Sequence, residues 1–136
     1  MREAKMRVLV TAAGRQDATA QIARSIGETL RRRGLAATVA RPEDVRKIET
    51  YDAVVVGSAV HGGHWLRPAN KLVRRAGNAL ASRPVWVFST GSVGDTAHVA
   101  ELTSARGQRV IDFGDSSSVD GWANEIADAL KASAAA

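Results

Sequence analysis

Short runs of β-branched residues alternate with segments of helical periodicity along most of the chain. The clearest run is Ala53-Val54-Val55-Val56, in which four apolar residues follow one another before Gly57. A strand that is apolar on both sides is typical of a parallel sheet covered by helices on both faces. Parallel strands need crossovers, and the helical segments supply them. The alternation therefore predicts an α/β fold with a doubly wound parallel sheet.

The boundaries of these elements follow from periodicity and from Gly and Pro. Gly34 is placed to end the first helix, and Pro68 suits the first turn of the second. The alanines at 132–136 are expected to fray. We expect strands at 7–11, 36–40, 51–58, 85–89 and 109–113, and helices at 18–33, 66–80, 99–106 and 119–130.

The chain of 136 residues contains no cysteine. This excludes a disulfide scaffold, a thiolate zinc site, a cysteine-ligated iron–sulfur cluster and cysteine catalysis. No run of about 18 apolar residues occurs, so we expect no membrane span. The N-terminus lacks the apolar region and the cleavage site of a signal peptide, which favours a cytoplasmic protein. The length predicts a single domain over 1–136.

Basic residues exceed acidic residues by 19 to 14, which gives a formal net charge of +5. Such an excess can indicate nucleic acid or another anionic partner. However, Arg31-Arg32-Arg33 and Arg74-Arg75 fall near the ends of predicted helices, where cations complement the helix dipole. No zinc finger, helix-turn-helix or RNP-like motif is found. We therefore expect a solvated basic surface and no nucleic-acid partner.

Three loops follow predicted strands and would meet at the carboxyl edge of the sheet, where doubly wound folds bind ligands. In the first, 11–19, small residues precede a helix N-terminus, whose free N–H groups can bind phosphate. A plain turn in which Asp17 caps the helix explains this loop equally well. Hydroxyl groups and one positive charge could add to a phosphate site. Its candidate residues are Thr11, Gly14, Arg15, Gln16, Ala18 and Thr19.

The second loop, 58–65, combines glycines, histidines and a tryptophan. The glycines would allow a flat ring to lie against the backbone, while Trp65 could cover the ring and the histidines could donate hydrogen bonds to it. Alternatively, Trp65 belongs to the core and the histidines are exposed. No metal site is expected, because two histidines have no evident third ligand. The candidate residues are Ala59, Val60, His61, Gly62, Gly63, His64 and Trp65.

The third loop, 89–95, could contact the other side of the same ligand through its backbone. Ser92 lacks the strand–GxSxG–helix setting of a hydrolase nucleophile, because Gly91 precedes it directly. We therefore assign no catalytic residue. The candidate binding residues are Thr90, Gly91, Ser92, Gly94 and Asp95.

Several segments resemble one known family. They are residues 8–19, residues 51–65, residues 83–89 with Gly94-Asp95, and residues 122–127. In sequence and in order they are similar to flavodoxin-like proteins, and most similar to the type that includes menaquinone-dependent protoporphyrinogen oxidase. The resemblance covers nearly the whole chain.

The resemblance implies a flavodoxin-like, five-stranded parallel sheet of order 2-1-3-4-5 with FMN as the cofactor. It places the FMN phosphate in the first loop and the isoalloxazine ring between the second and the third. The implied function is electron transfer to or from a redox partner, or a small flavin-dependent oxidoreductase.

Three departures from the family pattern leave other functions open. Gly14 and Ala18 stand where the family has hydroxyl residues, and Asp17 stands where it has glycine, so a like charge is added near the phosphate. Gly62 replaces an aromatic residue of the oxidases. Only five residues, 114–118, fill the place of a long oxidase insertion. The alternative is a flavodoxin-fold protein in which FMN is weakly bound or lost and which acts as a binding or accessory protein; a true protoporphyrinogen oxidase is least favoured.

Overall fold

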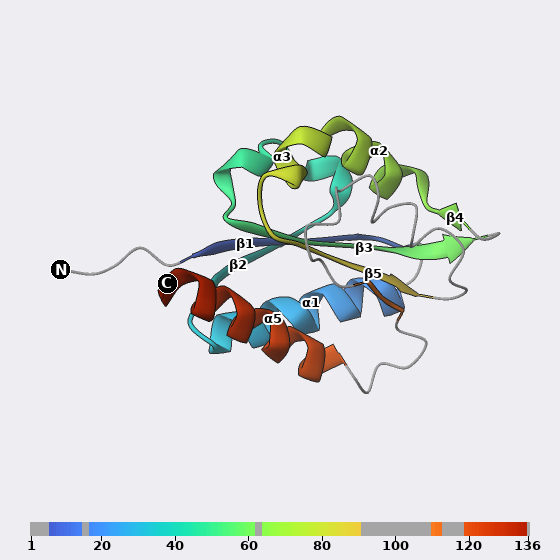
Figure 1. Cartoon of the computed structure of the whole chain (residues 1–136). Helices are drawn as coiled ribbons and strands as arrows, with labels where there is room; N and C mark the ends of the chain where they lie inside the picture. The colour runs from blue at the N-terminus through green and yellow to red at the C-terminus, as the bar shows by residue number, and fades with distance from the viewer. Residues whose placement is uncertain (1–5, 15–16, 62–63, 91–109, 113–118, 136) are drawn as a thin grey trace.

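The computed structural model of this chain describes residues 6–14, 17–61, 64–90, 110–112 and 119–135. Within these ranges it describes the side chains except those at 17–18, 60–61, 64–65, 89–90, 110–112 and 133–135. A parallel sheet lies between two layers of helices (Figure 1). One layer contains α1 (Asp17–Arg32) and α5 (Val119–Ala135), and the other contains α2 (Arg67–Arg75) and α3 (Gly77–Ala81).

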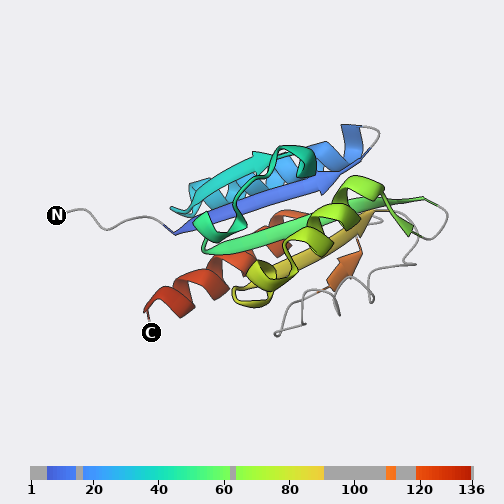
Figure 2. The same cartoon turned by 90° about the horizontal axis from the view of Figure 1, so that it is seen from above.

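The strands lie side by side when the sheet is seen from above (Figure 2). The described strands are β1 (Arg7–Ala13), β2 (Ala36–Ala40), β3 (Ala53–His61), β4 (His64–Trp65), β5 (Val85–Thr90) and β6 (Val110–Asp112). β1 pairs in parallel with β2 and β3, and β3 pairs in parallel with β5. The order β2-β1-β3-β5 confirms the predicted order of the first four parallel strands.

The short strand β6 pairs in parallel with β5, from Val87 opposite Val110 to Ser89 opposite Asp112. It lies within the segment predicted as the fifth strand, 109–113. The five-stranded sheet stays a prediction, because the residues on both sides of β6 lie outside the described ranges. The predicted helix at 99–106 lies outside them as well.

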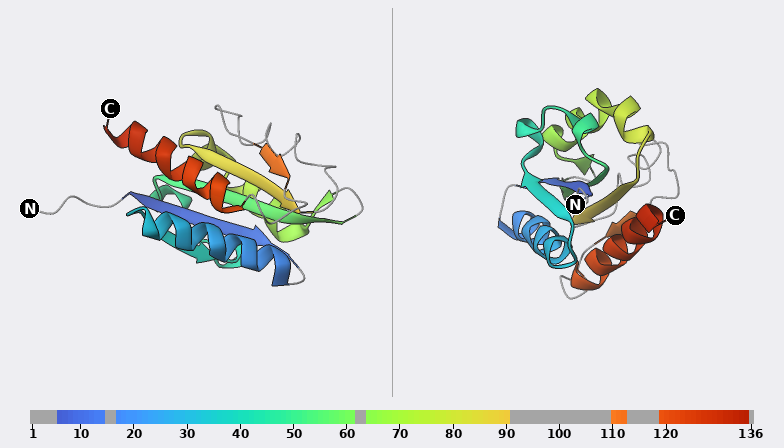
Figure 3. Two further views of the ribbon diagram at one scale, coloured as in Figure 1. Left: turned by 90° about the horizontal axis from the view of Figure 1, so that it is seen from below. Right: turned by 90° about the vertical axis from the view of Figure 1, so that its left-hand side faces the viewer.

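The central strands are buried on both faces, as the valine run predicted. Residues Ala53 to Val56 are all 0% exposed. Val55 packs into the cluster on the α1 and α5 side, whereas Val54 and Val56 pack into the cluster on the α2 and α3 side. The end-on view in the right-hand panel of Figure 3 shows the helices on both sides of the sheet. Burying one such side chain contributes about 1.5–3 kcal/mol.

The helix α1 ends within one residue of its predicted end at residue 33. The helix stops at Arg32, and Gly34 adopts a positive φ of 89°. The Leu35 N–H then donates to the Leu30 carbonyl at 3.0 Å, which satisfies a carbonyl of the last turn. Glycine adopts this left-handed conformation without the steric cost of a Cβ.

Two predicted helices differ in extent from the structure. The predicted helix at 66–80 is two helices, because Ala76 leaves the helical region with φ −102° and ψ 15°, and the next residue, Gly77, is a poor helix former. At the C-terminus, α5 continues to Ala135, five residues beyond the predicted end at 130. Alanine has the highest intrinsic helix propensity, which accounts for this extension.

The link between β2 and β3 contains two short 3₁₀ helices that the sequence analysis did not predict, η1 (Pro42–Asp44) and η2 (Ile48–Thr50). Both bring an apolar residue onto the α2 and α3 side of the sheet, where Val45 and Ile48 are buried. None of the helices in the described part of the chain is long and apolar enough to cross a membrane.

Candidate functional site

The three predicted loops do begin at one edge of the sheet. In the strand register, Ala13 of β1 lies opposite Ser58 of β3, and Ser58 lies opposite Ser89 of β5. These three strands therefore end together, at the right-hand side of the molecule in Figure 1. The carboxyl edge of a doubly wound sheet is where its ligands bind.

The connection between β1 and α1 is shorter than predicted. β1 continues through Ala13 and α1 begins at Asp17, so only residues 14–16 join them. Arg15 and Gln16 lie outside the described residues. Asp17, predicted as the residue that caps the helix, is the first residue of α1 itself. A 16-residue helix presents free N–H groups and a partial positive charge at this end.

Gly14 forms a close contact that only glycine allows. A Cβ added to Gly14 would lie 2.6 Å from Cβ and 2.9 Å from Oγ1 of Thr19. The side chain of Thr19, in the first turn of α1, is itself 4% exposed. The hydroxyl residue that the family resemblance implies at position 14 therefore has no room here. The loop backbone lies against the first turn of the helix instead, in a cradle that a Cβ would fill.

Thr11 lies inside β1 rather than in the loop, because the strand extends two residues further than predicted. Its side chain is 0% exposed, and its hydroxyl has no hydrogen-bond partner among the described residues. An unpaired buried hydroxyl costs about 1–3 kcal/mol. Its role as a phosphate ligand stays a prediction.

The second predicted loop is a β-hairpin. β3 continues to His61, and β4 pairs with it in antiparallel fashion, with Val60 opposite Trp65 and His61 opposite His64. The expectation of an irregular loop over 59–65 was therefore wrong for the ends of this segment. Gly62 and Gly63 lie outside the described residues. The residues predicted to face a ring are thus carried by two paired strands.

Ser58 connects this hairpin to the helix that follows. Its side chain is fully buried at 0% exposure. The Ser58 hydroxyl donates to the carbonyl of Ala59 at 2.7 Å and accepts from the N–H of Leu66 at 3.0 Å. Leu66 is the N-cap residue of α2. One side chain therefore joins the start of the hairpin to its end.

Ser58 was not among the residues predicted from the sequence to belong to the site, although its position carries a signal. A hydroxyl residue at the end of a strand that is buried on both faces must find a hydrogen-bond partner. Its identity as the link between hairpin and helix depends on the fold, since Leu66 lies eight residues further along the chain.

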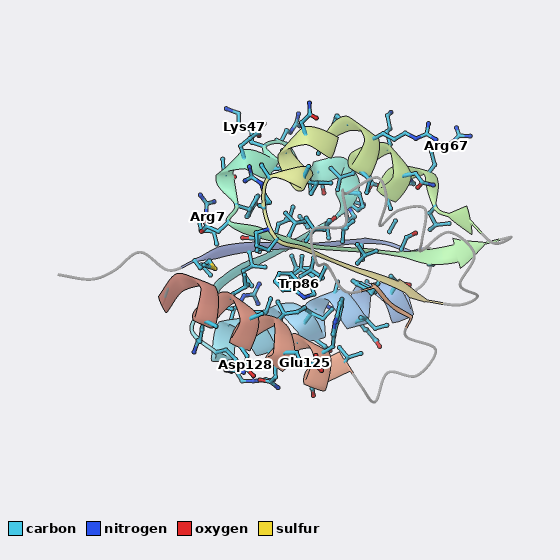
Figure 4. All side chains as sticks on the ribbon, in the orientation of Figure 1. Arg7, Lys47, Arg67, Trp86, Glu125 and Asp128 are labelled. Atoms are coloured by element: carbon cyan, nitrogen blue, oxygen red, sulfur yellow. The ribbon has the colours of Figure 1, made fainter. Side chains whose placement is uncertain are left out.

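Phe88 supports the same edge from the neighbouring strand. A Cβ at Gly57 would lie 2.3–2.5 Å from atoms of the Phe88 ring, so the ring covers the glycine backbone. Phe88 in turn makes an edge-to-face contact with Trp122 of α5, with centroids 5.9 Å apart. Trp86 of β5 packs against the same cluster, and Trp122 is buried on the packed face of α5. Figure 4 shows Trp86 between the sheet and the α1 and α5 layer.

The described part of the chain includes only the beginning of the third loop, and it includes the backbone but not the side chain of Trp65. Thr90 is the last residue of β5 and lies opposite Ala59. The backbone of Trp65 lies in β4, and its side chain is outside the described part. Also outside the described residues are Gly91, Ser92, Gly94 and Asp95.

A hollow of about 400 Å³ lies beside the end of β1. Small residues line it together with two arginines, Arg41 and Arg67. Neither arginine was predicted from the sequence as a site residue. Its volume falls in the range of small-molecule sites. Its lining residues are Ala12, Ala13, Gly14, Ala20, Arg41, Pro42, Glu43, Leu66, Arg67 and Pro68.

These observations define a doubly wound α/β protein whose ligand edge is formed by the carboxyl ends of β1, β3 and β5. A sequence profile of the family described as "Flavodoxin domain" matches residues 9–112. The chain belongs to this family. Membership of this family points to FMN as the cofactor and supports an FMN-binding, flavodoxin-like redox protein, as expected from the sequence.

Solved structures share the fold at low sequence identity. A flavodoxin from the domain Archaea superimposes with a TM-score of 0.76 at 20% identity, over 93% of this chain and 99% of that one. A cysteine-to-serine mutant of a flavodoxin from Pseudomonas aeruginosa gives 0.73 at 21% identity, over 93% and 99%. The rubredoxin oxygen:oxidoreductase from Desulfovibrio gigas gives 0.77 at 21% identity, over 97% of this chain and 38% of that protein. No curated protein sequence matches the chain.

Proposed function

We propose that this chain is a small electron-transfer protein or flavin-dependent oxidoreductase that holds FMN at the carboxyl edge of β1, β3 and β5. Residues 14–19 would hold the phosphate at the N-terminus of α1, and the hairpin 59–65 together with 90–95 would flank the ring. Bound FMN supplies the electron transfer, while the protein binds and orients it.

The observation that carries this proposal is the contact between Gly14 and Thr19 at the start of α1. The close approach leaves the loop backbone free of side-chain bulk at the end of a long helix, and exposed N–H groups there suit a dianionic phosphate. The hairpin supports the same assignment from the other side, because the Ser58 hydroxyl ties it to the start of α2 by accepting a hydrogen bond from the N–H of Leu66. The residues present therefore fit the cofactor.

Asp17 weakens this site, because it places a carboxylate at the first residue of α1. A negative charge at a helix N-terminus interacts favourably with the helix, and it repels a second anion there. We therefore expect the chain to bind FMN more weakly than it would with an uncharged residue at position 17. This observation also favours the second candidate function, a binding or accessory protein that has lost its flavin.

We propose a single domain over 1–136 whose complete sheet has the order 2-1-3-4-5, and the pairing of β6 with β5 supports this. A cytoplasmic location is proposed from the sequence. We also propose the relationship to the protoporphyrinogen oxidase type, without its porphyrinogen chemistry, because 114–118 leaves only five residues in place of the oxidase insertion.

The test compares FMN with riboflavin, which lacks the phosphate, by fluorescence titration of the purified chain. We expect FMN to bind more tightly than riboflavin. Asp17→Gly should tighten FMN several-fold, in line with the roughly 0.3–1 kcal/mol that one charge contributes at a helix end, and should leave riboflavin unchanged.

Glu28→Gln is the matched control, because Glu28 is an exposed acidic residue of the same helix, far from its N-terminus. It should change neither affinity. Equal binding of FMN and riboflavin by both the wild type and Asp17→Gly would contradict the phosphate site. A chain that retains no FMN after incubation with millimolar FMN and removal of the free flavin would contradict the FMN function and favour the second candidate function instead.

A further inference from the structure

The helices that follow the proposed flavin hairpin carry only positive charge. Residues 66–84 form α2 and α3 and contain no Asp or Glu. Two of the basic residues in this segment bond to the backbone: Arg75 donates to the Val45 carbonyl at 3.0 Å, and Arg83 donates to the Tyr51 carbonyl at 2.7 Å. The remaining three are Arg67, Lys71 and Arg74.

These three residues, named here the basic stripe, are exposed and make no hydrogen bond or ion pair among the described residues. Their spacing of four and three residues places them along one side of α2. The opposite side of the helix is buried through Ala69, Leu72 and Val73. The basic stripe is therefore the solvent face of α2, and it points away from the sheet.

Two charges of the basic stripe, on Arg67 and Lys71, are electrostatically unfavourable for α2, whereas Arg74 lies in its last turn, where a cation complements the helix dipole. Like charges four residues apart repel, and a cation in the first turn opposes the helix dipole. α2 has no acidic residue in its first turn and no side-chain cap. Arg67 occupies that first turn. Helix stability therefore does not account for the charges at Arg67 and Lys71, which are exposed to a partner.

The position of the basic stripe relates it to the proposed flavin site. Arg67 follows β4 after one intervening residue, and β4 is half of the hairpin proposed to flank the ring. Figure 4 shows Arg67 on the outside of α2, at the same end of the molecule as β3 and β4, whereas Lys47 lies toward the opposite end. A partner that exchanges electrons at the ring must approach this end.

A groove of about 290 Å³ lies between η1 and α2 and is lined by Arg67 and Lys71 of the basic stripe together with Arg75. Pro42 and Leu72 give it apolar walls, and Glu43 is its acidic residue. The mixture of a few cations with apolar surface is typical of a small protein interface. A nucleic acid calls for more phosphate contacts, and an anionic membrane calls for about 4–8 basic residues.

We propose that the basic stripe is the docking surface for an acidic redox protein that exchanges electrons with the flavin site beside it. This inference rests on the proposed function. Complementary charge raises the rate of encounter more than the strength of the complex, which suits a transient electron-transfer pair. In the exchange, the reduced partner loses one electron and the FMN-loaded chain gains it.

The probe is a reduced plant-type ferredoxin, a small acidic iron–sulfur protein. Stopped-flow absorbance follows its oxidation by the FMN-loaded chain at several salt concentrations. The triple variant Arg67→Gln, Lys71→Gln, Arg74→Gln should react about tenfold more slowly than the wild type at low salt. The difference should vanish near 1 M salt, where the Debye length is about 3 Å.

The matched control removes the same number of charges elsewhere, with Arg24→Gln, Lys47→Gln and Lys131→Gln, all exposed residues outside the basic stripe. Its rate should fall by less than about twofold. Rates that fall equally in both triple variants would overturn the proposal, and so would a rate that does not depend on salt.

A second measurement separates docking from the flavin function. Binding of oxidised ferredoxin to the FMN-free chain, followed by NMR line broadening, should be lost in the basic-stripe variant and kept in the control variant. Failure of the chain to bind FMN would defeat the proposed function while this binding still tests the docking surface. Binding of RNA or of phosphatidylserine vesicles that depends on the basic stripe, without binding of ferredoxin, would overturn the proposal.

Discussion

The two helical layers that cover the sheet differ in whether their charged side chains have bonding partners. In the α1 and α5 layer, the arginine after α1, Arg33, donates to the side chains of Asn124 and Asp128 on α5. The Thr29 hydroxyl donates to Asp120 of α5 at 3.3 Å. Polar bonds therefore join the two helices outside their apolar contact. In the α2 and α3 layer, the exposed cations of the basic stripe have no such partners among the described residues.

The two layers also differ in the side chains beneath them. The α1 and α5 side contains the aromatic pair of Phe88 and Trp122 together with Trp86. The buried cluster on the α2 and α3 side is filled by valine, leucine, isoleucine and alanine. The comparison indicates that the first layer combines aromatic packing with polar bonds between its helices, whereas the second carries the exposed cations beside the proposed ligand edge.

The largest expected effect comes from removing the aromatic contact of the first layer. Trp122→Ala should lower the free energy of unfolding by about 3–5 kcal/mol, because it deletes a side chain that is 2% exposed and leaves a cavity. Urea denaturation followed by circular dichroism measures the loss. Trp122→Phe, which keeps a ring against Phe88, should lose less than half as much. Equal losses in the two variants would show that the aromatic pair has no special weight.

The next effect separates stability from ligand binding at the edge. Ser58→Ala removes an acceptor of the Leu66 N–H and should cost about 1–2 kcal/mol in unfolding free energy. It should weaken FMN and riboflavin by the same factor, because the hairpin lies on the ring side. Ser82→Ala is the control, since the Ser82 hydroxyl donates at 3.0 Å in an exposed position. A loss confined to FMN would place the hairpin at the phosphate instead.

A smaller effect tests the polar bonds between α1 and α5. Asp128→Ala removes the partner of Arg33 and should cost about 0.2–1 kcal/mol, because the Asp128 side chain is 69% exposed and solvent screens the pair. The loss should shrink in 1 M NaCl. Differential scanning calorimetry at low and high salt measures both values. A loss that is unchanged by salt would point to packing rather than charge.

The smallest effect has the opposite sign and lies in the other layer. Lys71→Glu should raise the unfolding free energy by a few tenths of a kcal/mol, because it replaces repulsion with attraction to Arg67 and to Arg75, each four residues away. Urea denaturation at low salt measures the gain. Lys131→Glu on α5 is the control and should give no gain. A gain of the same size at both sites would mean that net charge, and not the basic stripe, sets the result.

Local sequence patterns were sufficient to predict most of the elements. The valine run predicted β3, helical periodicity predicted α1, and Gly34 predicted the end of that helix. Each of these depends on interactions within a few residues, such as burial on one face or a backbone conformation that glycine adopts. The placement of three loops at one edge follows from the alternation of strands and helices.

The hairpin and the contacts of the site could not be read in this way. β4 is two residues long, so no period reveals it, and it exists because it pairs with the end of β3. The links from Ser58 to Leu66 and from Gly14 to Thr19 join residues that meet only after the chain turns back. Whether a segment forms a strand depends largely on its own side chains and their near neighbours in the sequence, so the sequence alone can reveal it. A hydrogen bond or close contact between elements depends on their final separation, which packing of the whole sheet and its helices decides.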